Sequence, residues 1–275
     1  MTVGPSNDWA APWFAPYRPL LETLDLDLAA HRWPQCIAQL NDRAHDRGLV
    51  NDNGKPLRFV APDVAGDSAY EAHIWQTGNV PTRRDAEGAW HDFFNALVWL
   101  TFPRIKARLN ALQAGQIAAM GAGRTRGSLR DAATLFDENG ALLVTADREL
   151  VAALRRFDWR TLFVEDRARF SREVQVIVFG HALLDKLRAP YKAACAHVWV
   201  VDAAEGAALD ACRVDDRTAQ ALDPGSLHAG VFAPLPVLGI PGWWSANDDL
   251  RFYEDPRVFR SGRVLSRRGQ DGVCP

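Results

Sequence analysis

Residues 82–113 read TRRDAEGAWHDFFNALVWLTFPRIKARLNALQ and carry the longest helical pattern in the chain. At about 100° per residue, one arc of this helix is apolar, and it holds Trp90, Phe93, Phe94, Leu97, Val98 and Leu100. The other arc carries His91, Asp92 and Asn95. Pro103 cannot continue a helix because its ring clashes with the preceding turn, so we expect a break there and a second helix after it.

The polar arc of this helix also carries two aromatic side chains, Trp99 and Phe102. Large aromatic side chains are seldom left in water, so we expect this face to be covered. Covered polar groups need hydrogen-bond partners. Imidazole, carboxylate and amide groups on one face suit a metal site or general acid–base chemistry, and they equally suit a structural hydrogen-bond network. The sequence leaves both interpretations open.

Composition bounds the class of protein. The chain has 275 residues with 48% hydrophobic and 24% charged residues, which is enough for one large domain or two small ones and for a sizeable core. A net charge of −2 gives no electrostatic basis for binding nucleic acid or a membrane surface. No signal-peptide pattern begins the sequence, and no apolar run would span a bilayer. We therefore expect a cytoplasmic protein with free thiols.

Shorter patterns predict the flanking elements. Helices are expected at 34–47, 147–156 and 171–187, strands at 57–60, 70–77 and 198–201, and a hairpin at 130–145 around Glu138–Asn139–Gly140. The prediction is an α+β fold: a predominantly helical single domain, residues 1–275, with a small sheet and hairpin and a Pro/aromatic-rich C-terminal coil. Residues 1–20 are predicted to form an extended aromatic arm, and 261–275 a flexible basic tail.

Four motifs give the sequence a family resemblance. They read HDFFNALVWLTFPRIKARLN, RDAATLFDENGALL, FGHALLDKL and LPVLGIPGWW with FYEDPRVFR, in that order. Together they resemble the bacterial family catalogued as domain of unknown function 3025, over residues 59–260. The resemblance implies one folding unit and a bacterial origin. It implies no activity, cofactor or catalytic residue.

Two further constellations carry candidate chemistry. Asp137 ends an apolar run beside Glu138, and paired carboxylates can bind a divalent cation or act as acid and base. The alternative is that Glu138 belongs to a simple turn. His181 and Asp185 are four residues apart, so on a helix the carboxylate could orient the imidazole ring. The alternative there is a satisfied core histidine.

Two functions from different classes follow. The first is a hydrolase-type enzyme acting on a small polar substrate, with a divalent metal as its candidate cofactor. His91 would be its base or a metal ligand, with Asp92 or Asp137 as its carboxylate partner, and His181 would be the opposing acid or a second ligand. In the metal version the candidate ligands are His91, Asp137 and His181. Asn95 and Arg130 would orient the substrate. The second is a non-catalytic binding or assembly protein that uses a Trp-rich surface, including Trp243 and Trp244, and the arginines of the tail. No P-loop, GxGxxG, GxSxG or HExxH motif favours another enzyme class.

Overall fold

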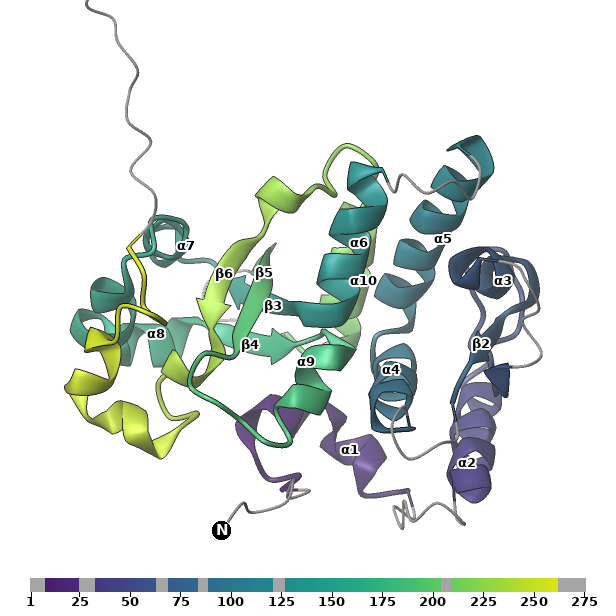
Figure 1. The fold of residues 1–275 in the computed structure, drawn as a ribbon, viewed down its shortest axis with the longest axis horizontal. Coiled ribbons are helices and arrows are strands. Elements are labelled where there is room, and N and C mark those ends of the chain that lie inside the picture. Colours follow the sequence, from purple (N-terminus) through teal and green to yellow (C-terminus); the bar gives the residue numbers. More distant parts are fainter. Residues whose placement is uncertain are drawn as a thin grey trace, which may run out of the picture.

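The computed structural model describes residues 8–24, 33–62, 69–83, 89–120, 127–203 and 209–261. The predicted basic tail lies outside these ranges, apart from residue 261. The described part is an α+β fold in which helices predominate and the strands form two small sheets (Figure 1). The predicted fold class is therefore confirmed.

A pair of helices, α4 (Ala89–Thr101) and α5 (Pro103–Met120), forms the centre of the fold, with the expected break at Pro103. Proline suits the first turn of α5 because its missing N–H would have no helical partner there. Asp215 of α10 (Ala211–Ala221) accepts hydrogen bonds from the next two backbone N–H groups, at 3.0 and 2.8 Å. Burial raises the pKa of this carboxyl to about 6. A residue 110 positions away in sequence therefore caps α5.

On one side of the helix pair lies a four-stranded sheet in the order β4-β3-β5-β6. Its strands are β3 (Gly140–Thr145), β4 (Gln175–Val178), β5 (Cys195–Asp202) and β6 (Ala233–Pro236). β3 pairs parallel with β5 and antiparallel with β4, and all of its residues are buried. Helices α6 (Ser128–Asn139), α9 (His181–Lys186) and α10 stand between this sheet and α4/α5 (Figure 1).

On the other side of the helix pair, α2 (Trp33–Asp46) and α3 (Tyr70–Thr77) pack with a two-stranded parallel sheet. Its strands are β1 (Arg58–Val60) and β2 (Asn79–Pro81). The contacts of α3 with α5 and of α2 with α4 attach this layer to the centre. The central helices are therefore covered on both sides, which explains why every residue of α4 from Asp92 to Leu100 is buried.

The remaining elements surround the sheet. Near the N-terminus these are η1 (Pro12–Tyr17) and α1 (Arg18–Leu21). Between β3 and β4 they are α7 (Arg148–Arg155), a π-helical turn η3 (Thr161–Glu165) and α8 (Arg167–Glu173). The C-terminal coil contains the short turns η4 (Ala229–Val231), η5 (Val237–Gly239), η6 (Ser245–Asp248) and η7 (Leu250–Glu254). Asn247, fully buried, donates to the carbonyls of Leu238 and Ile240, so the coil is an ordered part of the fold.

Predictions for three internal segments are wrong. Residues 70–77 form α3 rather than a strand, because the segment packs on α5 and ends at Gly78 in the left-handed region. Residues 130–145 form α6 followed directly by β3, so Glu138 ends a helix and is not in a hairpin turn. Residues 171–187 contain the end of α8, then β4, then α9, because pairing with β3 selects the strand that the β-branched valines favour.

The N-terminal segment packs on the body as expected, but Pro12–Tyr17 forms a 3-10 helix rather than an extended arm. Trp13, Phe14 and Tyr17 are buried, and the Tyr17 hydroxyl donates to the carbonyl of Val178 at 2.8 Å. Helices α2 and α7 and strands β1 and β5 lie where the sequence predicts them. Asp147 caps α7 by accepting from two backbone N–H groups.

Candidate functional site

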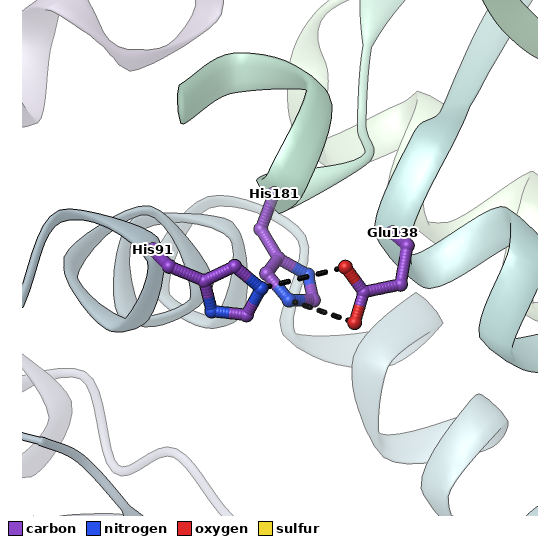
Figure 2. A group of neighbouring side chains, drawn as sticks. All are labelled: His91, Glu138 and His181. Atoms are coloured by element: carbon purple, nitrogen blue, oxygen red, sulfur yellow. Dashed lines mark hydrogen bonds and ion pairs between the residues drawn. The ribbon is translucent and has the colours of Figure 1, made fainter. Parts of the chain in front are cut away.

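Three side chains from separate helices meet beside the central helix pair: His91 from the first turn of α4, Glu138 from the end of α6 and His181 from the start of α9 (Figure 2). The Nε2 atom of His91 lies 3.4 Å from Oε2 of Glu138, and Nε2 of His181 lies 3.6 Å from Oε1. The two imidazole rings cross edge to face at 4.6 Å between centroids. One potential ligand atom from each residue lies within 4.8 Å of the other two.

The opposite nitrogens of both rings face carboxylates. Nδ1 of His91 forms a hydrogen bond of 3.1 Å with Oδ1 of Asp92. Nδ1 of His181 lies 3.7 Å from Oδ2 of Asp137, and among the described residues it has no hydrogen-bond partner. Each histidine therefore directs Nε2 toward Glu138 and Nδ1 toward an outer carboxylate. Such outer carboxylates fix ring orientation and tautomer in metal sites.

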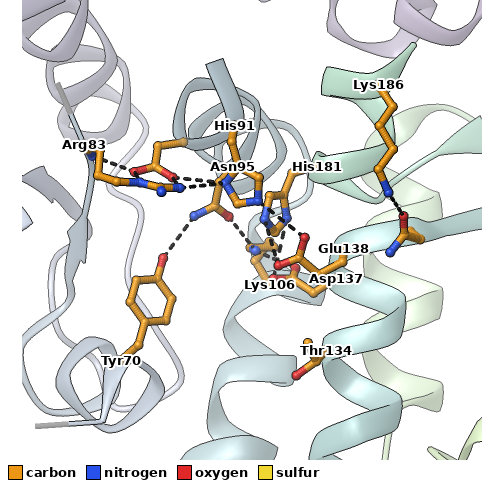
Figure 3. Close-up of polar contacts among 12 residues, drawn as sticks. Tyr70, Arg83, His91, Asn95, Lys106, Thr134, Asp137, Glu138, His181 and Lys186 are labelled. Carbon is orange, nitrogen blue, oxygen red and sulfur yellow. Dashed lines mark hydrogen bonds and ion pairs between the residues drawn. The ribbon is translucent and has the colours of Figure 1, made fainter. Parts of the chain in front are cut away.

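The outer carboxylates are themselves anchored by basic groups (Figure 3). Arg83 binds Asp92 through its backbone N at 2.6 Å, through Nε at 3.1 Å and through Nη2 at 2.9 Å. Lys106 of α5 is 4% exposed, and its Nζ donates to Asp137 at 2.5 Å and to Asn95 at 2.7 Å. Asp92 and Asn95 on the polar face of α4 are therefore buried and hydrogen-bonded, as their aromatic neighbours indicated, while the His91 side chain is 31% exposed.

Gly180 sets the position of His181. Its backbone N and that of Phe179 both donate to the carbonyl of Gly140. A Cβ atom at Gly180 would lie 2.5 Å from the carbonyl oxygen of Glu138 and 2.5 Å from the N of Gly140. These are backbone atoms of the α6–β3 junction, so neither can rotate away. Only glycine allows α9 to begin this close to Glu138.

The surroundings of the two histidines shift their pKa values in opposite directions. Hydrogen bonds with Asp92 and Glu138 raise the pKa of His91 to about 9, although burial opposes them. Burial lowers the pKa of His181 to about 4, although the charge of Asp137 opposes it. Burial alone would raise the pKa of Glu138, but its hydrogen bond with His91 and the charge of His181 bring it to about 2. At neutral pH the metal-free cluster therefore holds one protonated and one neutral imidazole.

The stability of the metal-free protein is expected to fall between pH 6.5 and pH 9. The folded pKa of His91 exceeds its unfolded value, so its contribution is complete below pH 6.5 and is lost as pH rises through 9. His181 has the opposite sign: its lowered pKa destabilises the folded state as pH falls from 6.5 to about 4, so it has no effect on stability above pH 6.5. Urea unfolding in a chelator should show wild type and His91→Gln converging from pH 6 to pH 9.5. A constant difference would contradict the assignment.

The structure brings together most of the candidates named from the sequence. His91, Asp92, Asn95, Asp137 and His181 all belong to this network. Two groups lie elsewhere. Arg130 lies near the other end of α6, with Nη2 3.7 Å from Oε2 of Glu71, and Asp185 pairs with Arg188 at 3.1 Å rather than with His181.

Three participants were not expected: Arg83, Lys106 and Tyr70, whose hydroxyl accepts from Asn95 at 3.1 Å. The sequence offered Glu138 either as one of a pair of carboxylates or as part of a simple turn, and it was not among the predicted metal ligands. A correct helical register for 128–139 would have placed Asp137 and Glu138 at the end of a helix whose apolar stripe includes Phe136. No sequence signal marks Arg83 or Tyr70, because both reach the network across a tertiary contact.

A cavity of about 830 Å³ lies at the other end of β3. Residues of η1, β3, β4 and the C-terminal coil line it, and none of the cluster residues does. Trp243, part of that lining, and Trp244 are both partly buried against the core. No helix within the described ranges has the length and apolar character needed to cross a membrane.

Fold and site together define an α+β protein with two histidines and three carboxylates gathered between its central helices and its sheet. The chain belongs to the family described as protein of unknown function (DUF3025), whose sequence profile matches residues 57–263. No curated protein and no solved structure matches the chain.

Proposed function

We propose that this protein is a metal-dependent hydrolase, in which His91, Glu138 and His181 bind one divalent ion. The supporting observation is the spacing of the three groups. Two atoms bound to one zinc ion at about 2.0–2.1 Å with tetrahedral angles lie about 3.4 Å apart. Nε2 of His91 lies 3.4 Å from Oε2 of Glu138 and Nε2 of His181 lies 3.6 Å from Oε1, at or beyond the long end of an N–H···O hydrogen bond, and one ligand atom from each residue lies within 4.8 Å of the other two.

The donor set fits such an ion. Two imidazoles and one carboxylate form the ligand set of hydrolytic zinc sites and also of non-haem iron(II) sites. Each imidazole has an outer carboxylate on its other nitrogen, Asp92 for His91 and Asp137 for His181. The unpartnered Nδ1 of His181 could donate to Asp137 after a small movement of the ring. In this proposal Glu138, rather than the predicted Asp137, is the carboxylate that binds the metal. Asp137 instead faces Nδ1 of His181 and orients its ring.

Hydrolysis is the reaction class that needs least beyond these groups, because water is its only co-reactant. Three protein ligands leave a fourth position on a tetrahedral ion for water or substrate. A bound divalent ion lowers the pKa of that water and polarises the substrate oxygen. His91 and Glu138 are each about one-third exposed, so the cluster can be reached from solvent.

Metal titration of the whole protein tests the proposal. Chelator-treated protein should bind one Zn²⁺ per chain, followed by calorimetry and by elemental analysis after dialysis. His181→Ala and Glu138→Gln should each lower the affinity at least about 100-fold, because each removes a ligand. His45→Ala removes a histidine that is 88% exposed and should bind as wild type does. Equal, weak binding by all four proteins would overturn the metal site.

Cobalt substitution distinguishes a metal site from a purely structural hydrogen-bond network. Co²⁺ in a four-coordinate site of this donor set should give visible absorption bands that disappear in His181→Ala. Iron recovered in place of zinc, with oxygen consumption, would leave the ligand assignment standing and overturn the hydrolytic reaction class.

A further inference from the structure

The cavity of about 830 Å³ at the far end of β3 borders an edge of the four-stranded sheet. β4 is an outer strand of this sheet, and three consecutive residues of it, Gln175, Val176 and Ile177, line the cavity. Side chains of successive strand residues point to opposite faces of a sheet. A lining that includes all three therefore follows the edge of the strand rather than one face.

The pairing of β4 with β3 identifies which backbone groups lie on this edge. In an antiparallel pair, hydrogen-bonded positions alternate along each strand with positions that are not bonded to the partner. Phe179 N donates to the carbonyl of Gly140, so the register places the next bonded position at Ile177, opposite Leu142. The backbone N–H and C=O of Val176, between these positions, therefore point away from β3.

Tyr17 agrees with this direction and marks where the open edge ends. Its hydroxyl donates to the carbonyl of Val178 at 2.8 Å, so that carbonyl, two residues beyond Val176, also points away from β3. Within the described ranges, no group outside the sheet forms a hydrogen bond with the backbone of Val176. Val176 therefore presents one free donor and one free acceptor beside the cavity.

The opposite edge of the sheet, strand β6, is protected by proline. Val237 N donates to the carbonyl of Ala194, so the same alternation turns Pro234 and Pro236 outward. Proline has no N–H, and its presence on an outer strand hinders pairing with another chain. β4 contains no proline, so of the two edge strands it is β4 that offers an outward N–H.

The cavity lining also carries one positive charge without a carboxylate partner. Arg18 donates to three backbone carbonyls, at 3.0, 2.5 and 3.3 Å, and these acceptors are neutral. The other charged side chains of the lining have partners of opposite charge in the described part of the chain: Arg172 pairs with Glu173 at 2.7 Å, and Asp210 with Arg213 at 4.0 Å. Arg18 is therefore the cation that a carboxylate in the cavity would neutralise.

The apolar part of the lining includes Phe170, Ile240 and Trp243. A largely apolar pocket of this size with a few polar groups is typical of ligand sites. We propose that the carboxyl-terminal end of another polypeptide binds here, as an extended segment beside β4 with an apolar last residue. Val176 pairs with its backbone, Arg18 binds its terminal carboxylate, and the apolar lining contacts its last side chain.

This peptide site is separate from the proposed metal centre. β3 begins at Gly140, near the cluster, and ends at Thr145, which lines the cavity, so about 17 Å separates them at about 3.3 Å per residue. Tyr17 also closes the edge of β4 at Val178, before the chain reaches His181. A peptide bound beside β4 therefore does not reach the metal ligands, and the inference does not depend on the hydrolase assignment.

Fluorescence anisotropy with dansyl-labelled pentapeptides tests the proposal on the wild-type protein. The peptides alternate threonine and valine and end in leucine, phenylalanine or valine with a free carboxylate. At least one should bind, and converting its carboxylate to an amide should weaken binding at least about tenfold, because Arg18 loses its anion. Methylating its backbone nitrogens one at a time should weaken binding at alternate positions, since every second amide faces β4.

Three results would overturn the proposal: no binding by any of the peptides, equal binding by the acid and the amide, or a methylation effect that is the same at every position. Binding of decanoate without binding of any peptide would assign the cavity to a small carboxylate instead, and would overturn the peptide as its occupant.

Variants at Val176 locate the binding site. Val176→Pro removes the outward N–H and keeps the hydrogen bonds between β4 and β3, so it should weaken peptide binding at least about tenfold. Val176→Thr keeps the N–H and a similar shape and should bind as wild type does. If Val176→Pro does not fold, the methylated peptides on wild type decide the question. Zinc-loaded and chelator-treated protein should bind the peptide equally, so a failed metal site would leave this result standing.

Discussion

Gly180→Ala should lower the free energy of unfolding by about 2–3 kcal/mol and weaken zinc binding at least about tenfold. The added methyl group would lie 2.5 Å from two backbone atoms at the α6–β3 junction. Relief requires α9 to move away from the end of α6, which separates His181 from Glu138. This substitution replaces no ligand residue, yet it should reduce both the stability of the protein and its affinity for zinc. Urea unfolding and zinc calorimetry measure the two effects.

Gly115→Ala provides the control for this substitution. Gly115 lies inside α5, and a Cβ atom there would meet nothing within 4 Å among the described residues. Alanine is favoured over glycine in a helix interior, so this variant should gain about 0.5–1 kcal/mol of stability. Zinc affinity should not change. A Gly180→Ala protein that matches wild type in both measurements would show that α9 does not depend on the close approach.

Lys106→Met should cost about 3–5 kcal/mol of stability, the largest effect expected from one side chain in the cluster. Lys106 is buried, pairs with Asp137 at 2.5 Å and lies 5.4 Å from the ring centroid of Trp99. Methionine keeps most of the apolar chain but leaves Asp137 and the oxygen of Asn95 without their donor. Removing one partner of a buried pair strands the other charge. Urea unfolding at pH 7 measures the loss.

Two further proteins make the Lys106 result interpretable. Lys106→Met combined with Asp137→Asn should recover part of the lost stability, because no charge is then stranded. Lys192→Met removes a similar set of contacts at the surface: an ion pair of 3.4 Å with Asp255 and a ring contact of 4.4 Å with Phe252. Its side chain is 35% exposed, so the expected loss is below about 1 kcal/mol. Equal losses at Lys106 and Lys192 would contradict the buried-pair account.

Only some residues of the candidate site could be identified from local sequence patterns. His91, Asp92 and Asn95 could be identified because a long amphipathic helix fixes which side chains share a face. Glu138 could be identified only as one of a pair of carboxylates and not as a ligand, since ENG between two apolar runs is also the pattern of a tight turn. His181 was named with the wrong partner, Asp185. The two residues do share α9, but Asp185 pairs with Arg188, and Nδ1 of His181 faces Asp137 of α6.

The sequence by itself determined the helix pair broken at Pro103, the apolar core, the α+β class and the family. These features depend on local sterics and on periodicity, which the order of residues records directly. Only the tertiary structure decided that β4 is a strand and that His91, Glu138 and His181 meet. Pairing with β3 supplies the free energy that selects the strand, and contacts between residues as far apart as α4 and α9 bring the three ligands together. Neither the β4 strand nor the meeting of the three ligands can be predicted from one segment of the sequence alone.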